Sequence, residues 1–193
     1  MEQSNSGCYH RPVLLGETLA ALDVRPDGVY LDGTAGGGGH AFAIASRLKQ
    51  GRLVALDQDP DAVAEASERL RGLPAVVIRS NFADMRAVLH DLGIPGLDGV
   101  LLDIGVSSHQ LDPPERGFSY HADAPLDMRM SQSGRTAADL IASLSEKGLA
   151  SIFSRYGEEP FARPIARAVV RAREEKPIAT TGALAELVKE AVP

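Results

Sequence analysis

The sequence has no tryptophan and only one cysteine, Cys8, and aromatic residues make up 5% of its 193 residues. A single cysteine cannot form an internal disulfide framework, which favours a reducing compartment. Apolar runs stay well short of the ~20 residues that span a bilayer, and the first residues lack the apolar centre of a signal peptide. We therefore expect a cytoplasmic protein that does not enter a membrane.

Basic residues are also in short supply. The 20 Lys and Arg residues are outnumbered by 26 Asp and Glu residues, giving a formal net charge of −6 and a pI near 5.4. This balance argues against a protein that coats nucleic acid by bulk charge, but it permits a local basic patch. His90, His109 and His121 do not have the spacing of metal ligands, so we expect no metal ion.

Short apolar segments alternate with amphipathic ones between residues 28 and 107. We expect strands at 29–34, 52–57, 75–80 and 98–105, and helices at 40–49, 60–71 and 84–92. Apolar runs without alternation are typical of strands buried on both faces. Strand–helix–strand repetition predicts right-handed crossovers between parallel strands. The sequence therefore predicts an α/β fold with a doubly wound parallel sheet.

The pattern changes after residue 110. Residues 111–135 combine proline, glycine and both signs of charge without a period, which is typical of a long ordered loop. Residues 136–193 have apolar positions at helical spacing. We expect three parts, 1–110, 111–135 and 136–193, and no fifth strand. An uncovered sheet edge favours pairing with another chain, for which a homodimer is one form.

Four consecutive glycines, residues 36–39, follow the first expected strand. Because glycine adds nothing to a core, such a run predicts bare backbone held close to a ligand. In open parallel sheets, ligands bind outside the carboxyl ends of the strands. A triphosphate loop would need Lys and then Ser or Thr after the last glycine, but His40 and Ala41 stand there. A dinucleotide and S-adenosylmethionine remain as candidate ligands.

Two aspartates favour the second candidate. Gly36, Gly38 and Ala41 satisfy the G-x-G-x-x-A pattern that an NAD-dependent oxidoreductase would use. Asp32, just ahead of the glycines, would repel a pyrophosphate but suits the ammonium group of a methionine moiety. Asp57, at the end of the second strand, suits a ribose hydroxyl. We favour a methyltransferase, with the oxidoreductase as the alternative.

Several longer segments resemble the bacterial RsmH (MraW) family. They are "HRPVLLGETL" from His10, "YLDGTAGGGGH" from Tyr30, "ALDQDP" from Ala55, "LLDIGVSSHQLD" from Leu101, "ERGFS" from Glu115, "PLDMRM" from Pro125 and "YGEEPFARPIARAVV" from Tyr156. These enzymes transfer a methyl group from S-adenosylmethionine to the exocyclic N4 of a cytidine in the decoding region of small-subunit ribosomal RNA.

The resemblance implies a Rossmann-like class I methyltransferase fold with a helical inserted domain. Residues 1–110 would bind S-adenosylmethionine, 111–135 would form an active-site loop, and 136–193 would recognise the substrate. Family members are longer, so the resemblance also implies that the chain stops inside the helical region, before the closing strands. The expected partner is small-subunit ribosomal RNA or the assembling small ribosomal subunit.

The resemblance further implies a cofactor site. Its residues would be Gly38, Gly39, His40, Asp57, Phe82, Asp103 and Gln110. The aromatic face of Phe82 would lie beside the adenine, and Asp57 would hold the ribose. Asp103, or the carbonyl groups next to it, would orient the target amine during catalysis. Its alternative role is to bind the ammonium group of the cofactor.

Basic and aromatic residues point to RNA in the second half of the chain. A target cytidine must leave its RNA context to reach such a site. The loop carries residues suited to a lid that grips a base, namely Arg116, Phe118, Tyr120 and Arg129. Arg163, Arg167 and Arg171 fall four apart on one helical face, where they would hold phosphates or form a solvated stripe. A non-catalytic RNA-binding fragment is a further alternative.

Overall fold

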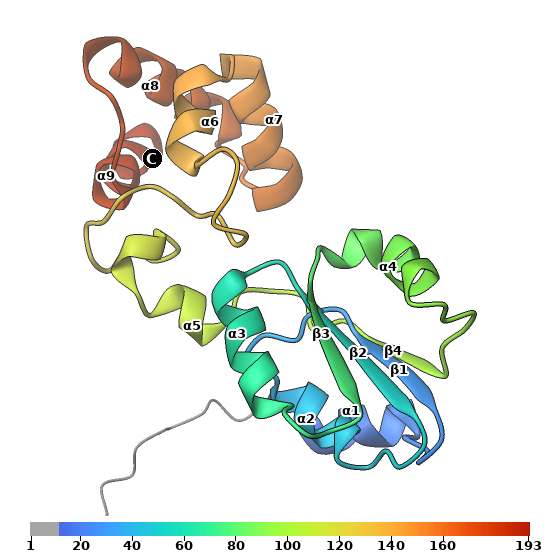
Figure 1. Cartoon of the computed structure of the whole chain (residues 1–193). Coiled ribbons are helices and arrows are strands. Elements are labelled where there is room, and N and C mark those ends of the chain that lie inside the picture. The colour runs from blue at the N-terminus through green and yellow to red at the C-terminus, as the bar shows by residue number, and fades with distance from the viewer. Residues whose placement is uncertain (1–11) are drawn as a thin grey trace, which may run out of the picture. The chain divides into compact units, whose positions relative to one another are not determined.

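The computed structural model describes residues 12–193; Cys8 and His10 lie outside these residues. The described residues form two compact units that divide between Gly105 and Val106, and Figure 1 shows them in blue to green and in yellow to red. The division falls near the limit expected at residue 110. The three-part organisation with its assigned roles stays a prediction.

The first unit is built on a four-stranded sheet. Its strands are β1 (Val29–Asp32), β2 (Arg52–Asp57), β3 (Ala75–Arg79) and β4 (Gly99–Leu101), in the order β3-β2-β1-β4, and all pairs are parallel. The predicted parallel sheet is therefore confirmed. The chain winds outward from β1 to β3 and then returns to the other side of β1. The end of β1 is thus the point where the strand order reverses, and ligands bind there in open α/β sheets.

Helices cover both faces of this sheet (Figure 1). They are α1 (Leu15–Leu22), α2 (Gly39–Ala45), α3 (Pro60–Arg69) and α4 (Met85–Asp91), with a 3₁₀ turn at Phe82–Asp84. Successive strand residues point to opposite faces. Accordingly, Leu53 shares an apolar core with Ile44 of α2, whereas Val54 shares another with Leu89 of α4. The sheet is doubly wound, as expected.

The central strands are more buried than the outer ones. Leu53 and Val54 of β2 are fully buried, but Val100 of β4 is 44% exposed. The expectation of burial on both faces therefore holds for β1 and β2 alone. Strand β4 is also shorter than the predicted 98–105. It ends at Leu101 because the next segment leaves the sheet, and the amide of Asp103 donates to Thr34 Oγ1.

The second unit is helical. Its helices are α5 (Ser108–Leu111), α6 (Ala137–Ser143), α7 (Glu146–Gly157), α8 (Ala162–Glu175) and α9 (Thr181–Ala191), with a 3₁₀ turn at Pro114–Arg116. Leu149 of α7 and Ile165 and Val169 of α8 are buried in one apolar core. None of the described helices is long and apolar enough to cross a bilayer.

The segment 111–135 is an ordered part of this unit. Leu126 is buried, and its amide donates to the Ala179 carbonyl over 2.9 Å. Pro125 forms an isolated bridge with Thr180, and the Met128 amide donates to the Arg116 carbonyl over 3.0 Å. The first two contacts join the loop to the segment just before α9, and the third joins two parts of the loop.

Candidate functional site: the carboxyl ends of the strands

Three carboxylates stand at the carboxyl ends of adjacent strands. Asp32 is the last residue of β1, Asp57 is the last residue of β2, and Asp103 follows β4 by two residues. Both Asp57 and Asp103 act on Asp32 through their charge, raising its pKa. The three groups therefore form one acidic site, which favours a ligand with positive charge.

Asp32 is the buried member of this group, with 1% of its surface exposed. Its Oδ1 accepts a hydrogen bond of 3.1 Å from the Thr34 amide. Its Oδ2 is buried, and no group among the described residues donates to it. Burial raises the pKa of Asp32 to about 7, the two neighbouring carboxylates add to this, and the Thr34 hydrogen bond opposes it. A buried polar atom without a partner calls for a ligand group.

Asp57 holds the glycine loop in place. Its Oδ2 accepts a hydrogen bond of 2.8 Å from the Gly36 amide, and its Oδ1 accepts one of 2.9 Å from the Asp59 amide. A carboxylate has about four lone-pair positions, so both oxygens keep capacity for a ligand hydroxyl. Asp57 therefore suits both a structural role and the expected ribose contact.

The glycine loop follows a path that other residues would not adopt. Gly36 and Gly38 have φ values of 51° and 77°, in the left-handed region that favours glycine. A Cβ at Gly38 would also lie 3.2 Å from the Ala66 Cα atom of α3. The predicted bare backbone is thus required by both conformation and packing.

The side chain of His40 points into the protein. It is buried, and its Nε2 lies 3.0 Å from the Val13 carbonyl oxygen. A Cβ at Gly39 would lie 2.5 Å from Pro12 Cγ, so the segment before α1 lies against the loop. A contact of His40 with a cofactor would therefore come from its backbone.

Phe82 and Asp103 lie near the start of the glycine loop. A Cβ at Gly33 would be 3.1 Å from the Phe82 Cβ atom, and the Asp103 amide donates to Thr34 Oγ1 over 2.7 Å. Phe82 is half-buried and the Asp103 side chain is exposed. The structure thus brings five expected positions, Gly38, Asp57, Phe82, Asp103 and Asp32, to the carboxyl ends of the strands.

Thr34 is a residue that the sequence analysis missed. Its amide donates to Asp32 and its hydroxyl accepts from the Asp103 amide, so it links two of the three carboxylate positions. The Asp-Gly-Thr order was the available signal, because an aspartate commonly accepts from the amide two residues on. Asn81 was also missed: its Nδ2 donates to Gln58 Oε1 over 3.1 Å and joins the segments after β3 and β2.

Gln110 belongs to the second unit, where it contacts Ser107. Its Oε1 accepts from the Ser107 amide over 3.1 Å, and its side chain is buried. Two residues of the expected lid also have local contacts. Arg116 Nη2 donates to the carbonyls of Arg129 and Met130, and the Arg129 guanidinium holds the pKa of Asp127 below its usual range through their hydrogen bonds. The cofactor contact of Gln110 and the lid stay predictions.

The acidic site suits one of the two candidate ligands better. A ligand carrying ammonium and sulfonium groups would meet the unpartnered Asp32 Oδ2 and two further carboxylates, whereas a pyrophosphate would be repelled by them. No set of three or more His, Cys, Asp or Glu residues within 12–193 is arranged to hold a metal ion.

Fold and geometry together define a Rossmann-like α/β protein with a candidate ligand site at its switch point. Comparison with known proteins gives the family. The profile of the MraW methylase family matches residues 7–193, and the chain belongs to this family.

Curated relatives are about 50% identical to this chain over the residues that align. The ribosomal RNA small subunit methyltransferase H 2 of Agathobacter rectalis is 51% identical over 189 residues, which are 95% of this chain and 60% of that protein. The ribosomal RNA small subunit methyltransferase H of Brevibacillus brevis is 50% identical and is also covered to 60%. The chain thus spans 60% of the length of these relatives.

Solved structures resemble the chain only in part. An rRNA methylase from Streptococcus thermophilus matches with a TM-score of 0.35 and 20% identity, covering 42% of this chain and 50% of that one. A precorrin 8w decarboxylase from Methanobacterium thermoautotrophicum matches with a TM-score of 0.37 and 21% identity, covering 45% of each chain. Similarity at this level does not carry an assignment of function.

Proposed function

We propose that this chain provides the S-adenosylmethionine site of an enzyme that methylates the exocyclic N4 of a cytidine in the decoding region of small-subunit ribosomal RNA. Membership of the MraW methylase family supports methyl transfer, and the names of the curated relatives support ribosomal RNA as the substrate. The family also favours the methyltransferase over the NAD-dependent oxidoreductase. Because the chain spans 60% of these relatives, the activity of the whole protein is part of the proposal.

The unpartnered Oδ2 of Asp32 is the observation that carries this proposal. A buried carboxylate oxygen with no donor is costly, and an ammonium group of the cofactor would supply the donor. Asp57 would hold the ribose and Phe82 would lie beside the adenine. The backbone of Gly38, Gly39 and His40 would approach the amino-acid end of the cofactor, and Gln110 would be a further cofactor contact.

Bound S-adenosylmethionine supplies a methyl group that is already activated as part of a sulfonium. The chain therefore has to hold the cofactor and the target amine in line and to exclude water. The nitrogen of a cytidine amine is a poor nucleophile because its lone pair is delocalised into the ring. Asp103 would accept a hydrogen bond from that amine, turn its lone pair toward the methyl group, and be the first acceptor for the proton that is lost.

The backbone and the side chain of Asp103 both suit this role. Its backbone amide is held by Thr34 Oγ1 over 2.7 Å, so its place beside β4 is fixed. Its side chain is exposed and free to meet a substrate from outside the sheet. The alternative is that Asp103 binds the cofactor ammonium together with Asp32. An Asp103→Asn variant that binds the cofactor normally but transfers methyl groups slowly would favour the first role.

Isothermal calorimetry with S-adenosylmethionine tests the cofactor site. We expect saturable binding by the wild-type chain and a loss of at least tenfold in affinity in Asp32→Asn, because the amide has no charge to offer the ammonium. Asp91→Asn, an exposed change of the same kind on α4, is the matched control. Binding of NADH in place of S-adenosylmethionine would contradict the proposal and support the oxidoreductase.

A methyl-transfer assay on small-subunit ribosomal RNA tests the substrate. Methyl groups carried by labelled S-adenosylmethionine should appear on cytidine N4 after incubation with this chain and purified small-subunit RNA, and mass spectrometry of the digested RNA locates them. RNA binding without any transfer would instead favour the non-catalytic alternative.

A further inference from the structure

Three arginines of α8 lie at intervals of four residues on the exposed side of the helix. Arg163, Arg167 and Arg171 are exposed, whereas Ile165 and Val169 between them are buried in the core of the second unit. Four residues rise about 6 Å along an α-helix, so the three guanidinium groups follow one another along one face. We refer to these three residues as the α8 arginine row.

The α8 arginine row is largely unpaired. Within residues 12–193, Arg163 and Arg171 form no ion pair or hydrogen bond, and Arg167 Nε lies 3.7 Å from Glu146 Oε1. Arg167 and Glu146 are both exposed, and an exposed pair at this distance is weak. From Ala162 to Arg173 the helix has no acidic residue. The row therefore offers positive charge that the protein itself does not use.

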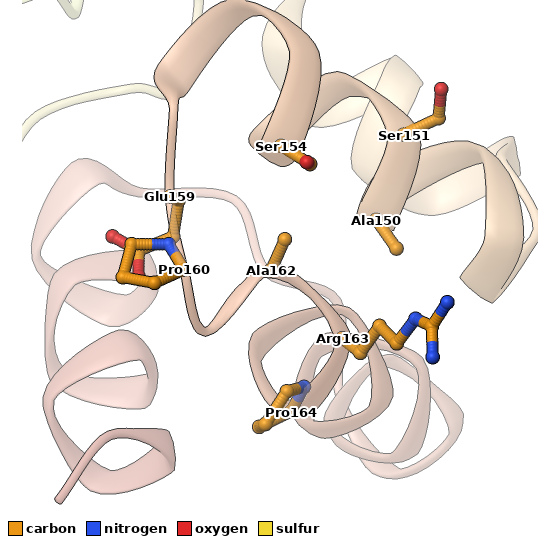
Figure 2. A pocket seen from close by; sticks show the side chains of 8 residues that line it. All are labelled: Ala150, Ser151, Ser154, Glu159, Pro160, Ala162, Arg163 and Pro164. Atoms are coloured by element: carbon orange, nitrogen blue, oxygen red, sulfur yellow. The ribbon is translucent and has the colours of Figure 1, made fainter.

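The first arginine of the row lines a cavity of about 560 Å³ between α7 and α8. Ser151 and Ser154 of α7 line the same cavity, and Figure 2 shows them with Arg163. Glu159 stands on the other side of the cavity from Arg163 in this view, and its Oε1 accepts a hydrogen bond of 2.8 Å from the Phe161 amide. Guanidinium and hydroxyl groups are typical donors to phosphate oxygens.

We propose that the α8 arginine row, together with Ser151 and Ser154, binds consecutive backbone phosphates of a single RNA strand. Three cations spaced along a helix match a chain of phosphates better than one compact anion. The net charge of −6 excludes attraction of RNA by bulk charge, so a local row of this kind is what an RNA ligand would require. The choice of RNA rests on the proposed function, but the surface can be tested without methyl transfer.

The test is binding of a short fluorescent oligocytidine RNA to the full chain, followed by anisotropy at several salt concentrations. The variant carries Arg163→Gln, Arg167→Gln and Arg171→Gln together. We expect at least a tenfold loss of affinity at low salt. The slope of log K against log salt should fall by about 2, since each lost phosphate contact removes about 0.7. Ser151→Ala with Ser154→Ala should give a smaller loss and leave the slope unchanged.

The matched control carries Arg47→Gln, Arg71→Gln and Lys189→Gln, three exposed cations on other helices or turns. It changes the net charge equally and should retain wild-type affinity for the RNA. An equal loss in the control would overturn the proposal, because general electrostatics would then explain binding. Unchanged affinity and slope in the α8 variant would also overturn it. An acidic protein would then be the better candidate partner for the α8 arginine row.

Calorimetry with S-adenosylmethionine on the α8 variant separates this proposal from the proposed function. Cofactor binding should equal that of the wild type, because the variant leaves the first unit intact. Suppose that the wild type does not bind S-adenosylmethionine, but that the α8 variant binds RNA more weakly than the wild type does. The proposed function then fails and the proposed RNA surface stands. If the cofactor binds and the α8 changes have no effect on RNA, the surface fails alone.

Discussion

The amide of Gly36 donates a hydrogen bond of 2.8 Å to Asp57 Oδ2, and so the loop that follows β1 is held by the last residue of β2. The adjacent Ala35 amide donates to the Leu56 carbonyl over 2.9 Å and extends this contact. The loop is therefore fixed by the neighbouring strand. Asp57 therefore has a structural role in the loop, besides the ribose contact that we propose for it.

Replacing Asp57 by alanine should thus affect stability as well as cofactor binding. The amides of Gly36 and Asp59 would lose their acceptor, and each lost hydrogen bond of this kind costs about 1–3 kcal/mol. Urea unfolding should show the loss without any ligand present. A variant as stable as the wild type would mean that the loop does not depend on Asp57.

Replacing Asp32 by asparagine should change how stability depends on pH. The pKa of this aspartate is raised to about 7 in the folded protein, from an ordinary value near 3.8, mainly by burial. Its stabilising contribution is complete below pH 3.8 and is lost as the pH rises from there through about 7, because the unfolded chain releases this proton while the folded protein still holds it. The loss approaches about 4 kcal/mol at about 1.4 kcal/mol per pKa unit.

The measurement is urea unfolding of wild type and Asp32→Asn between pH 4 and pH 9. The variant should gain stability over the wild type from pH 4 to about pH 7 and keep a constant advantage from there to pH 9. Curves that stay parallel throughout would show that Asp32 is already ionised at low pH, against the geometry of its burial.

Affinity for S-adenosylmethionine should fall when the pH is lowered below about 7. An ionised Asp32 attracts the ammonium group, while a protonated one does not, and linkage then reduces affinity by up to about tenfold per pH unit. Equilibrium dialysis across this range, with Asp32→Asn as the variant that lacks the dependence, checks the expectation. A wild-type affinity that is flat from pH 5 to pH 8 would contradict it.

Two neighbouring glycines should respond differently to alanine. Gly38 has φ 77°, and a Cβ there would lie 3.2 Å from the backbone of Ala66, so Gly38→Ala should cost about 1–2 kcal/mol or more. At Gly37 the nearest atom is Glu65 Oε1 at 2.5 Å, the end of a flexible side chain that can move. Thermal unfolding of both variants compares the two costs. Equal losses would show that α3 does not restrict the loop at Gly38.

Arg173 should be important for stability although its neighbours in α8 are not. Its Nη1 donates to the carbonyls of Ile141 and Leu144 over 2.6 and 2.7 Å, at the end of α6. Arg173→Ala should therefore cost about 1.5–3 kcal/mol, as expected for hydrogen bonds to a charged group. Arg171→Ala, on the exposed side, should change stability by less than about 0.5 kcal/mol. The urea midpoints of the two variants measure both losses, and equal midpoints would contradict the prediction.

The sheet and its helices were predictable because their patterns are local. Strand β2 was expected at 52–57 and occurs at Arg52–Asp57, since a buried parallel strand is a continuous apolar run. Helix α3 begins at Pro60, where proline fits the first turn, and Asp59 accepts from the Asp61 amide as its cap. Helix α1 was not predicted, because apolar residues at 13–15 obscure its period.

The placement of the site was predictable, but its internal contacts were not. Asp32 and Asp57 were expected to face a ligand. However, no sequence pattern indicates that Asp57 accepts a hydrogen bond from the Gly36 amide, or that one oxygen of Asp32 has no partner among the described residues. Such contacts join residues from different strands and depend on how β1 and β2 align. The side-chain contact of His40 with Val13 is likewise a tertiary contact that no local pattern specifies.

A carboxyl group that is half protonated at neutral pH has a thermochemical consequence. When a cation binds beside Asp32, the proton held there passes to the surrounding buffer. The heat measured in a titration near pH 7 then includes the heat with which the buffer takes up that proton. The enthalpy of cation binding beside Asp32 should therefore differ between phosphate and Tris solutions by the heat of that proton transfer.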